Sequence, residues 1–138
     1  MPKISIGITT FKRPEKLINC IRSIFNQTYK DYEIIIGNDD PNQKITSKTN
    51  DLFSNSKIRI INNEKNLGER DNMNNLLKIA SGEYFIWLSD DDTLFSNFFE
   101  KNIINLEQND KVVASYTSYT SKKELSKKEN NFQIFEQK

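Results

Sequence analysis

Three consecutive aspartates follow a strongly apolar stretch of this chain. The run Ser89-Asp90-Asp91-Asp92 comes directly after Tyr84-Phe85-Ile86-Trp87-Leu88, whose composition is typical of a buried β-strand. Like charges held this close repel one another. A divalent cation relieves that repulsion, because Mg²⁺ and Mn²⁺ prefer oxygen ligands and keep coordination positions open for phosphate. The alternative is a solvated acidic loop that caps the following helix; the position at the end of a strand favours the metal site.

Length, charge and the missing residue types narrow the classes of function. The 138 residues favour one domain, and a net charge of +1 implies no general attraction to nucleic acid or to an anionic membrane. The absence of histidine excludes, within this chain, a Ser-His-Asp or Cys-His hydrolase and a histidine-ligated zinc site. A single cysteine, Cys20, excludes an intramolecular disulfide. No apolar run reaches membrane-spanning length, so we expect a soluble protein of the cytoplasm.

Apolar runs alternate with amphipathic helical patterns along the chain. Strands are predicted at residues 4–8, 33–36, 57–61, 83–88 and 112–116. Helices are predicted from Pro14, across 45–53, from Met73 to Ala80 and from Phe95 to Leu106. This alternation predicts an α/β fold with a mainly parallel sheet and helices on both faces. Beyond Ser121 the sequence is polar, and only Phe132-Gln133-Ile134-Phe135 has the apolar content to pair or pack.

The large aromatic side chains are expected in the core rather than in a binding site. Trp87 belongs to an apolar strand. Phe95, Phe98 and Phe99 belong to a helix whose apolar residues are expected to point inward.

Polar residues gather where the predicted strands end. In a parallel sheet, ligands bind beyond the carboxyl ends of the strands, where the strand order reverses. Carboxylates, hydroxyls and two arginines follow the first four strands, at residues 9–13, 38–40, 66–70 and 89–92. A nucleoside diphosphate with a metal ion requires this combination, since a carboxylate accepts from a base N–H or a ribose hydroxyl and arginine neutralises phosphate.

In this order and spacing, the segments resemble the N-terminal half of the family 2 glycosyltransferases, which have the GT-A fold. The resemblance runs from Ile4 to about Tyr116. It rests on Ile4-Ser5-Ile6-Gly7-Ile8-Thr9-Thr10-Phe11-Lys12-Arg13-Pro14, Ser23-Ile24-Phe25-Asn26-Gln27-Thr28-Tyr29, Glu33-Ile34-Ile35-Ile36-Gly37-Asn38-Asp39-Asp40, Asn66-Leu67-Gly68, Ala80-Ser81-Gly82-Glu83-Tyr84 and Ser89-Asp90-Asp91-Asp92.

The resemblance implies a Rossmann-like, three-layer α/β/α fold and a role for eight residues. For the nucleoside, it implies that Thr9 and Phe11 line the pocket, that Asp39 contacts the base and that Asp90 lies near the ribose. For the diphosphate and its metal, it implies that Asp91 and Asp92 bind the metal and that Arg13 and Arg70 contact the diphosphate. The sequence departs from the family pattern at two positions. Asn38 stands where the family often has aspartate, and Ser89 replaces the usual first aspartate of the DxD region.

The implied activity is transfer of a sugar from a nucleotide-diphosphate sugar to an acceptor hydroxyl, with inversion and with Mn²⁺ or Mg²⁺. UDP is the family's most frequent donor nucleotide, and the acceptor would be a saccharide or a lipid-linked sugar in polysaccharide biosynthesis. The catalytic base is expected beyond Lys138, since nothing places Glu124, Glu129 or Glu136 in that role. The expected location is the cytoplasm or the inner face of the membrane, and an exposed apolar surface would allow a homodimer.

A second interpretation remains open. Residues 1–120 would form the N-terminal part of the domain and residues 121–138 a polar tail that begins the acceptor-side half, so this chain would bind donor without turning it over. A phosphoryl-transfer domain with an aspartate nucleophile ranks third, because the first strand ends in threonines.

Each candidate also has a purely structural interpretation. Thr9 and Thr10 would satisfy backbone groups, Asp39 and Asp40 would form a turn with Pro41, and Arg70 would pair with Glu69 or Asp71.

Overall fold

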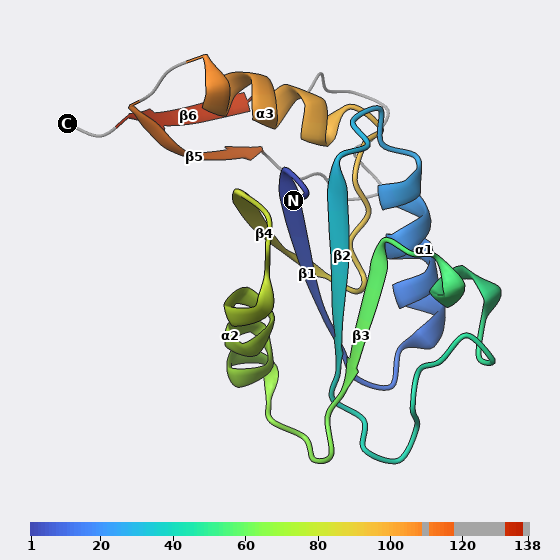
Figure 1. Ribbon diagram of the computed structural model, residues 1–138. Coiled ribbons are helices and arrows are strands. Elements are labelled where there is room, and N and C mark those ends of the chain that lie inside the picture. Colours follow the sequence, from blue (N-terminus) through green and yellow to red (C-terminus); the bar gives the residue numbers. More distant parts are fainter. Residues whose placement is uncertain (109–110, 118–131, 137–138) are drawn as a thin grey trace, which may run out of the picture. The chain divides into compact units, whose positions relative to one another are not determined.

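The computed structural model describes residues 1–108, 111–117 and 132–136 (Figure 1). The chain forms two compact units, one from residues 1–26 and 30–95, the other from residues 27–29 and 96–138. Every residue to which the sequence assigns a binding role lies in the first unit.

A four-stranded parallel sheet forms the centre of the first unit. Its strands are β1 (Ile4–Thr10), β2 (Tyr32–Asn38), β3 (Ile58–Asn62) and β4 (Tyr84–Ser89), in the order β3-β2-β1-β4. Ile34 to Ile36 of β2 are fully buried. Such a continuous apolar run is typical of a strand covered on both faces, as the sequence predicts.

One helix covers each face of this sheet. Helix α1 (Pro14–Phe25) joins β1 to β2, and α2 (Glu69–Ile79) joins β3 to β4. These two connections move across the sheet in opposite directions, so right-handed crossovers place α1 and α2 on opposite faces (Figure 1). Leu17 and Ile21 of α1 and Leu76 of α2 are buried in the resulting three-layer core.

All four parallel strands end at the same edge of the sheet, and the strand order reverses between β1 and β4. Hydrogen bonds continue past the ends of the strands: the Asp39 N–H donates to the Thr10 carbonyl at 2.9 Å, and the Asn63 N–H donates to the Asn38 carbonyl at 2.9 Å. The loops at this edge are therefore extensions of the sheet, which fixes the side chains that they carry.

A partly buried polar cluster lies at the opposite edge of the sheet. Glu33 Oε1 accepts hydrogen bonds from the Ser5 hydroxyl at 2.6 Å, the Ser81 N–H at 2.8 Å and the Ser81 hydroxyl at 2.7 Å. Burial raises the pKa of Glu33, but these hydrogen bonds and the charge of Arg59 outweigh it, so that the pKa lies below its ordinary value of 4.5. Glu33 therefore ties β1, β2 and the turn before β4 together as a carboxylate.

The second unit contains helix α3 (Phe98–Glu107) and an antiparallel pair, β5 (Val112–Thr117) and β6 (Phe132–Glu136). Phe99, Ile103 and Val112 are buried, and Gln27 Oε1 accepts from the Phe99 N–H at 3.1 Å at the start of the helix.

The structure corrects two predictions about secondary structure. The strand predicted at 112–116 does not extend the parallel sheet but pairs with β6, which confirms that Phe132–Phe135 pairs. The helix predicted at 45–53 is only a short 3₁₀ turn, η1 (Asp51–Ser54), in which Phe53 is the buried residue. Residues 121–131 and 137–138 of the expected tail lie outside the described residues.

Two aromatic side chains expected in the core are exposed. Trp87 is 45% exposed and Phe95 is 47% exposed, whereas Phe99 is buried as predicted. Trp87 lies on β4, which among the described residues pairs with β1 alone and so forms an edge of the sheet. Its ring contacts Phe85 and its indole N–H donates to the Met73 carbonyl at 3.4 Å, while nearly half of the residue stays exposed.

Candidate functional site

A pocket of about 240 Å³ lies at the carboxyl ends of the strands, and we call it the strand-end pocket. Its walls come from the β1–α1 loop, the end of β2, the β3–α2 loop and the start of α2. Its lining residues are Thr9, Thr10, Phe11, Arg13, Asp39, Asn66, Gly68, Glu69 and Asn72. Four of the predicted donor-binding residues, at positions 9, 11, 13 and 39, thus meet in one pocket although they follow two different strands.

Asp39 is the most firmly held side chain of this pocket. It is 4% exposed, and its Oδ1 accepts hydrogen bonds from Asn63 Nδ2 at 2.9 Å and from the Leu67 N–H at 3.0 Å. Its Oδ2 accepts from the Gly68 N–H at 2.9 Å. A carboxylate has about four acceptor positions, so one position on Oδ2 is left for a ligand.

The turn interpretation holds for the neighbouring aspartate rather than for Asp39. Asp40 Oδ1 accepts from the Asn42 N–H at 3.0 Å, which is an ordinary turn-forming contact. Asn38, where the family often has aspartate, is likewise structural, since its Nδ2 donates to Gln43 O at 2.7 Å and to Asn62 Oδ1 at 2.9 Å.

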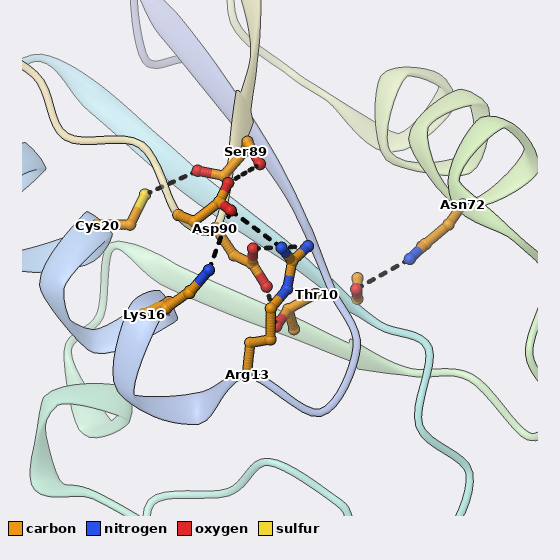
Figure 2. A network of polar contacts seen from close by, with 9 residues as sticks. Thr10, Arg13, Lys16, Cys20, Asn72, Ser89 and Asp90 are labelled. Atoms are coloured by element: carbon orange, nitrogen blue, oxygen red, sulfur yellow. Dashed lines mark hydrogen bonds and ion pairs between the residues drawn. The ribbon is translucent and has the colours of Figure 1, made fainter. Parts of the chain in front are cut away.

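Asp90, Asp91 and Asp92 follow β4, and we call them the acidic segment. Two residues that line the strand-end pocket, Thr10 and Arg13, also contact this segment. Asp90 is fully buried, and the Thr10 hydroxyl donates to its Oδ2 at 2.6 Å. Arg13 lies 3.0 Å from Asp90 Oδ1 through Nη2 and 3.1 Å from Asp91 Oδ2 through Nη1. Lys16 Nζ lies 3.3 Å from the same oxygen of Asp91. Figure 2 shows Thr10, Arg13 and Lys16 converging on this segment.

Burial and charge act differently on the two adjacent carboxylates. Burial raises the pKa of Asp90 despite the hydrogen bond from Thr10 and the charge of Arg13. Hydrogen bonds from Ser89 and Lys16 lower the pKa of Asp91, whose side chain is 37% exposed. Asp91 is therefore the accessible, ionised member of the pair.

Cys20 packs beneath the same segment and is chemically inert there. Its Sγ donates to the Ser89 carbonyl at 3.5 Å. Burial, followed by the charges of the three aspartates, raises the pKa of the thiol to about 12. It stays protonated at neutral pH, which excludes a thiolate nucleophile at this position.

The acidic segment has the donor chemistry that a hard divalent cation requires. Asp90 Oδ1 is buried and, within the described residues, has an ion pair but no hydrogen-bond partner. No group of three or more His, Cys, Asp or Glu side chains in the described part of the chain is arranged to hold a metal ion. A cation here would need further oxygen ligands, such as those of a phosphate, and Arg13 and Lys16 now provide the countercharge. Metal binding by Asp91 and Asp92 stays a prediction.

Arg70 is the predicted site residue that lies apart from this constellation. Its side chain is 87% exposed, and its Nε pairs with Asp71 Oδ1 at 3.2 Å, as the structural interpretation expects. It lines a shallow hollow with Leu67, Gly68 and Glu69 rather than the strand-end pocket. Its proposed contact with the diphosphate stays a prediction.

The sequence contains signals for two site residues that the analysis above does not predict. Lys16 follows Arg13 at the start of α1, where the helix dipole disfavours cations, so two basic residues there indicate acidic partners elsewhere. Asn72 lies four residues before Leu76 on the buried face of α2, and an amide at such a position needs partners.

The family model described as "Glycosyl transferase family 2" matches residues 5–138. Among curated relatives, the chain is 39% identical over 98 residues to a GalNAc(5)-diNAcBac-PP-undecaprenol beta-1,3-glucosyltransferase of Campylobacter jejuni, covering 70% of this chain and 32% of the relative. The chain spans 32% to 39% of the length of the first curated relatives that it matches.

Solved structures of GT-A glycosyltransferases share the fold. TarS of S. aureus, residues 1–349 in complex with UDP-GlcNAc, has a TM-score of 0.68 at 16% identity, covering 83% of this chain and 33% of that one. The mannosyltransferase PcManGT of Pyrobaculum calidifontis, in complex with GDP-Man and Mn²⁺, has a TM-score of 0.63 at 13% identity, covering 80% and 34%. These likenesses confirm the predicted GT-A fold class.

Proposed function

Since this chain belongs to glycosyl transferase family 2, we propose that it forms the donor site of an enzyme that transfers a sugar from a nucleotide-diphosphate sugar to an acceptor hydroxyl. One observation carries the proposal: the strand-end pocket and the acidic segment are joined through Thr10 and Arg13. The pocket proposed for the nucleoside thereby lies beside carboxylates and cations that suit a metal-bound diphosphate.

The nucleoside occupies the strand-end pocket in this proposal. Thr9 and Phe11 line it, and the open acceptor position on Asp39 Oδ2 takes a base N–H. Asp90 lies nearest the ribose. UDP is the proposed nucleotide, supported by the UDP-GlcNAc complex of TarS, while the GDP-Man complex of PcManGT indicates that the same fold accommodates guanine.

Asp91 and Asp92 would hold the divalent cation, Mn²⁺ or Mg²⁺. When bound, the cation neutralises charge on the departing diphosphate. Arg13 and Lys16 both reach Asp91, and they exchange this partner for phosphate oxygens when donor binds. Arg70 would contact the diphosphate from the start of α2.

The second half of the reaction is proposed from the family alone. It comprises inversion at the anomeric carbon and a base that deprotonates the acceptor. Glu124 and Glu129 lie outside the described residues, and Glu136 belongs to β6. A lipid-linked acceptor is supported by the name of the Campylobacter relative, and a role in polysaccharide biosynthesis stays a prediction.

Location and self-association are proposed from the sequence. The described part of the chain contains no helix with the length and apolar character to span a membrane. We place the protein in the cytoplasm or at the inner face of the membrane, and a homodimer stays a prediction.

A second candidate is a donor-binding unit that does not complete the reaction by itself. The observation in its favour is that the chain covers only about a third of the Campylobacter relative. In that case residues 1–120 bind donor, and residues 121–138 lead into the acceptor-binding part.

Calorimetry tests the donor site directly. UDP is titrated into the chain with and without Mn²⁺, and into the Asp91→Ala and Asp51→Ala variants, the latter removing one exposed carboxylate from η1. We expect Mn²⁺-dependent binding to the wild type and to Asp51→Ala, and its loss in Asp91→Ala. A UDP affinity that changes neither on addition of Mn²⁺ nor in Asp91→Ala contradicts the proposed role of the acidic segment.

Turnover separates the two candidates. If UDP binds and hydrolysis or transfer of UDP-sugar never rises above the background without protein, the donor-binding unit is favoured over the complete enzyme.

A further inference from the structure

Two asparagines connect Asp39 to the backbone of the sheet. Asn63 Nδ2 donates to Asp39 Oδ1 at 2.9 Å and to Asn72 Oδ1 at 3.2 Å. Asn72 Nδ2 in turn donates to the Gly37 carbonyl of β2 at 2.9 Å. We call Asn63 and Asn72 the amide relay.

The partners of the amide relay allow one orientation of each side chain. The Gly37 carbonyl can only accept, so the nitrogen of Asn72 must face it. The oxygen of Asn72 is then directed at Asn63, whose nitrogen must donate both there and to the carboxylate of Asp39. Both hydrogens of the Asn63 amide are thereby used, and neither amide can flip without losing its partners.

The anchor of the amide relay is tightly packed. Asn72 is 1% exposed. A Cβ added to Gly37 would lie 2.1 Å from Asn72 Oδ1, so glycine is needed to let the amide approach the strand. Asn72 therefore cannot shift along β2, and the position that it gives to Asn63 is fixed.

This arrangement determines which hydrogen bonds Asp39 has left. Asn63 and the Leu67 N–H occupy both acceptor positions of Oδ1, and the Gly68 N–H occupies one position of Oδ2. Only acceptor capacity remains on this 4%-exposed carboxylate, which lines the strand-end pocket. A base whose ring nitrogen carries an N–H is matched there, and one whose ring nitrogen presents a lone pair at that position is repelled.

We propose that Asn63 and Asn72 are positioning residues for base selection, which hold Asp39 so that it accepts bases with a ring N–H, such as uracil, and rejects cytosine, whose N3 is an acceptor. This inference rests on the proposed function and deepens it. Asn72 lines the strand-end pocket, but it is 1% exposed and its amide is bonded to Asn63 and to the Gly37 carbonyl, so in this proposal the amide relay acts through Asp39.

The test compares UDP and CDP affinities for the wild type, Asn63→Ala, Asn72→Ala and a matched control, Asn62→Ala. Asn62 is the preceding residue, is also half-buried and also bonds through its amide, but to Asn38 and Ile45 instead of Asp39. Calorimetry gives both dissociation constants, and circular dichroism shows that each variant is folded. The ratio of the two constants is the readout, because general destabilisation weakens both nucleotides alike.

We expect the wild type to prefer UDP over CDP by about tenfold or more, and this ratio to fall at least about threefold in Asn63→Ala and Asn72→Ala but not in Asn62→Ala. If Asn72→Ala does not fold, Asn63→Ala decides alone, since its side chain is only half-buried. An unchanged ratio in the relay variants overturns this inference and leaves the donor site standing. An equal fall in Asn62→Ala also overturns it. A wild type that binds no nucleotide at all overturns the proposed function together with this inference.

Discussion

The Thr10 hydroxyl donates a hydrogen bond of 2.6 Å to Asp90 although the two residues lie 80 positions apart in the chain. Thr10 ends β1 and Asp90 follows β4, so this bond joins the two strands at the point where the strand order reverses. The Thr10 hydroxyl therefore does not serve local backbone groups alone. It donates a hydrogen bond to Asp90, the fully buried carboxylate of the acidic segment.

Thr10→Val should therefore destabilise the fold. Valine keeps the shape of threonine but leaves a buried carboxylate oxygen without its donor, which costs about 1–3 kcal/mol. Urea denaturation at neutral pH measures the change. Thr9→Val, the same substitution one residue earlier and without a hydrogen bond to Asp90, should cost less. Equal costs would contradict the importance of the Thr10–Asp90 bond.

Arg13→Ala should change metal and nucleotide affinity in opposite directions. Arg13 neutralises Asp90 and Asp91, so without it these carboxylates should bind Mn²⁺ more tightly in the absence of nucleotide, by about threefold to tenfold. The affinity for UDP should fall, by about tenfold, since a phosphate partner is lost. Calorimetry measures both.

Lys12→Ala is the control for Arg13→Ala. It removes one positive charge at the neighbouring position, where the side chain lies over the Phe11 ring instead of the acidic segment. A similar pair of changes in this variant would show that overall charge, rather than the position of Arg13, is responsible.

Gly37→Ala should be strongly destabilising because of a specific clash. The new Cβ would lie 2.1 Å from Asn72 Oδ1 inside a packed layer, for which about 2 kcal/mol or more is expected. In the Gly37→Ala/Asn72→Ala double variant the clash is absent, so its cost should be clearly less than the sum of the two single costs. Thermal or urea unfolding of the three variants checks this, and strict additivity would exclude the clash.

Gly68→Ala gives a comparison with a different cause. Its added Cβ meets nothing within 4 Å, but its φ of +79° is unfavourable for alanine. A cost of about 1–3 kcal/mol is expected from the backbone alone, and it should not depend on Asn72.

Glu33→Gln should weaken the fold at neutral pH and lose its effect in acid. The pKa of Glu33 is lower in the folded protein than its ordinary value of 4.5, so the ionised form stabilises the fold above that pH. This contribution is lost as the pH falls through the folded-state pKa. The difference in unfolding free energy between wild type and variant should be about 1–2 kcal/mol at pH 7 and should approach zero in acid.

Glu83→Gln is the matched control for that series. Glu83 is an exposed carboxylate paired with Lys3 at 2.8 Å, and such pairs contribute little to stability. If the unfolding free energy of Glu83→Gln falls by a similar, pH-dependent amount, the hydrogen bonds of Glu33 do not explain the effect of Glu33→Gln.

The sequence was sufficient for the parallel sheet and its helices because their signals are local. Ile34 to Ile36 form a continuous apolar run, and Pro14 marks the first turn of α1, so period and composition determine these elements. The partner of β5 is a different matter. Its pairing with Phe132–Glu136 is a long-range contact, and the hydrophobic period of a strand does not indicate which other strand it pairs with.

The candidate site was predictable as a set of strand-end loops, but not as a set of contacts. That Thr9, Phe11, Arg13 and Asp39 share a pocket follows from the common edge of parallel strands. That Arg13 and Lys16 neutralise the acidic segment depends on where α1 begins relative to β4. Similarly, the exposure of Trp87 follows from β4 being an edge strand, which its own sequence does not reveal.

The strand order also has a consequence for how the protein is made. The residues that line the strand-end pocket all lie between Thr9 and Asn72, so all of them are synthesised before β4. Without β4, β1 is paired with β2 alone and its other edge has open backbone groups, the kind of edge on which chains aggregate. Pairing of β4 with β1 covers that edge and brings Asp90 to Thr10, so the same strand pairing closes the open edge and completes the acidic segment.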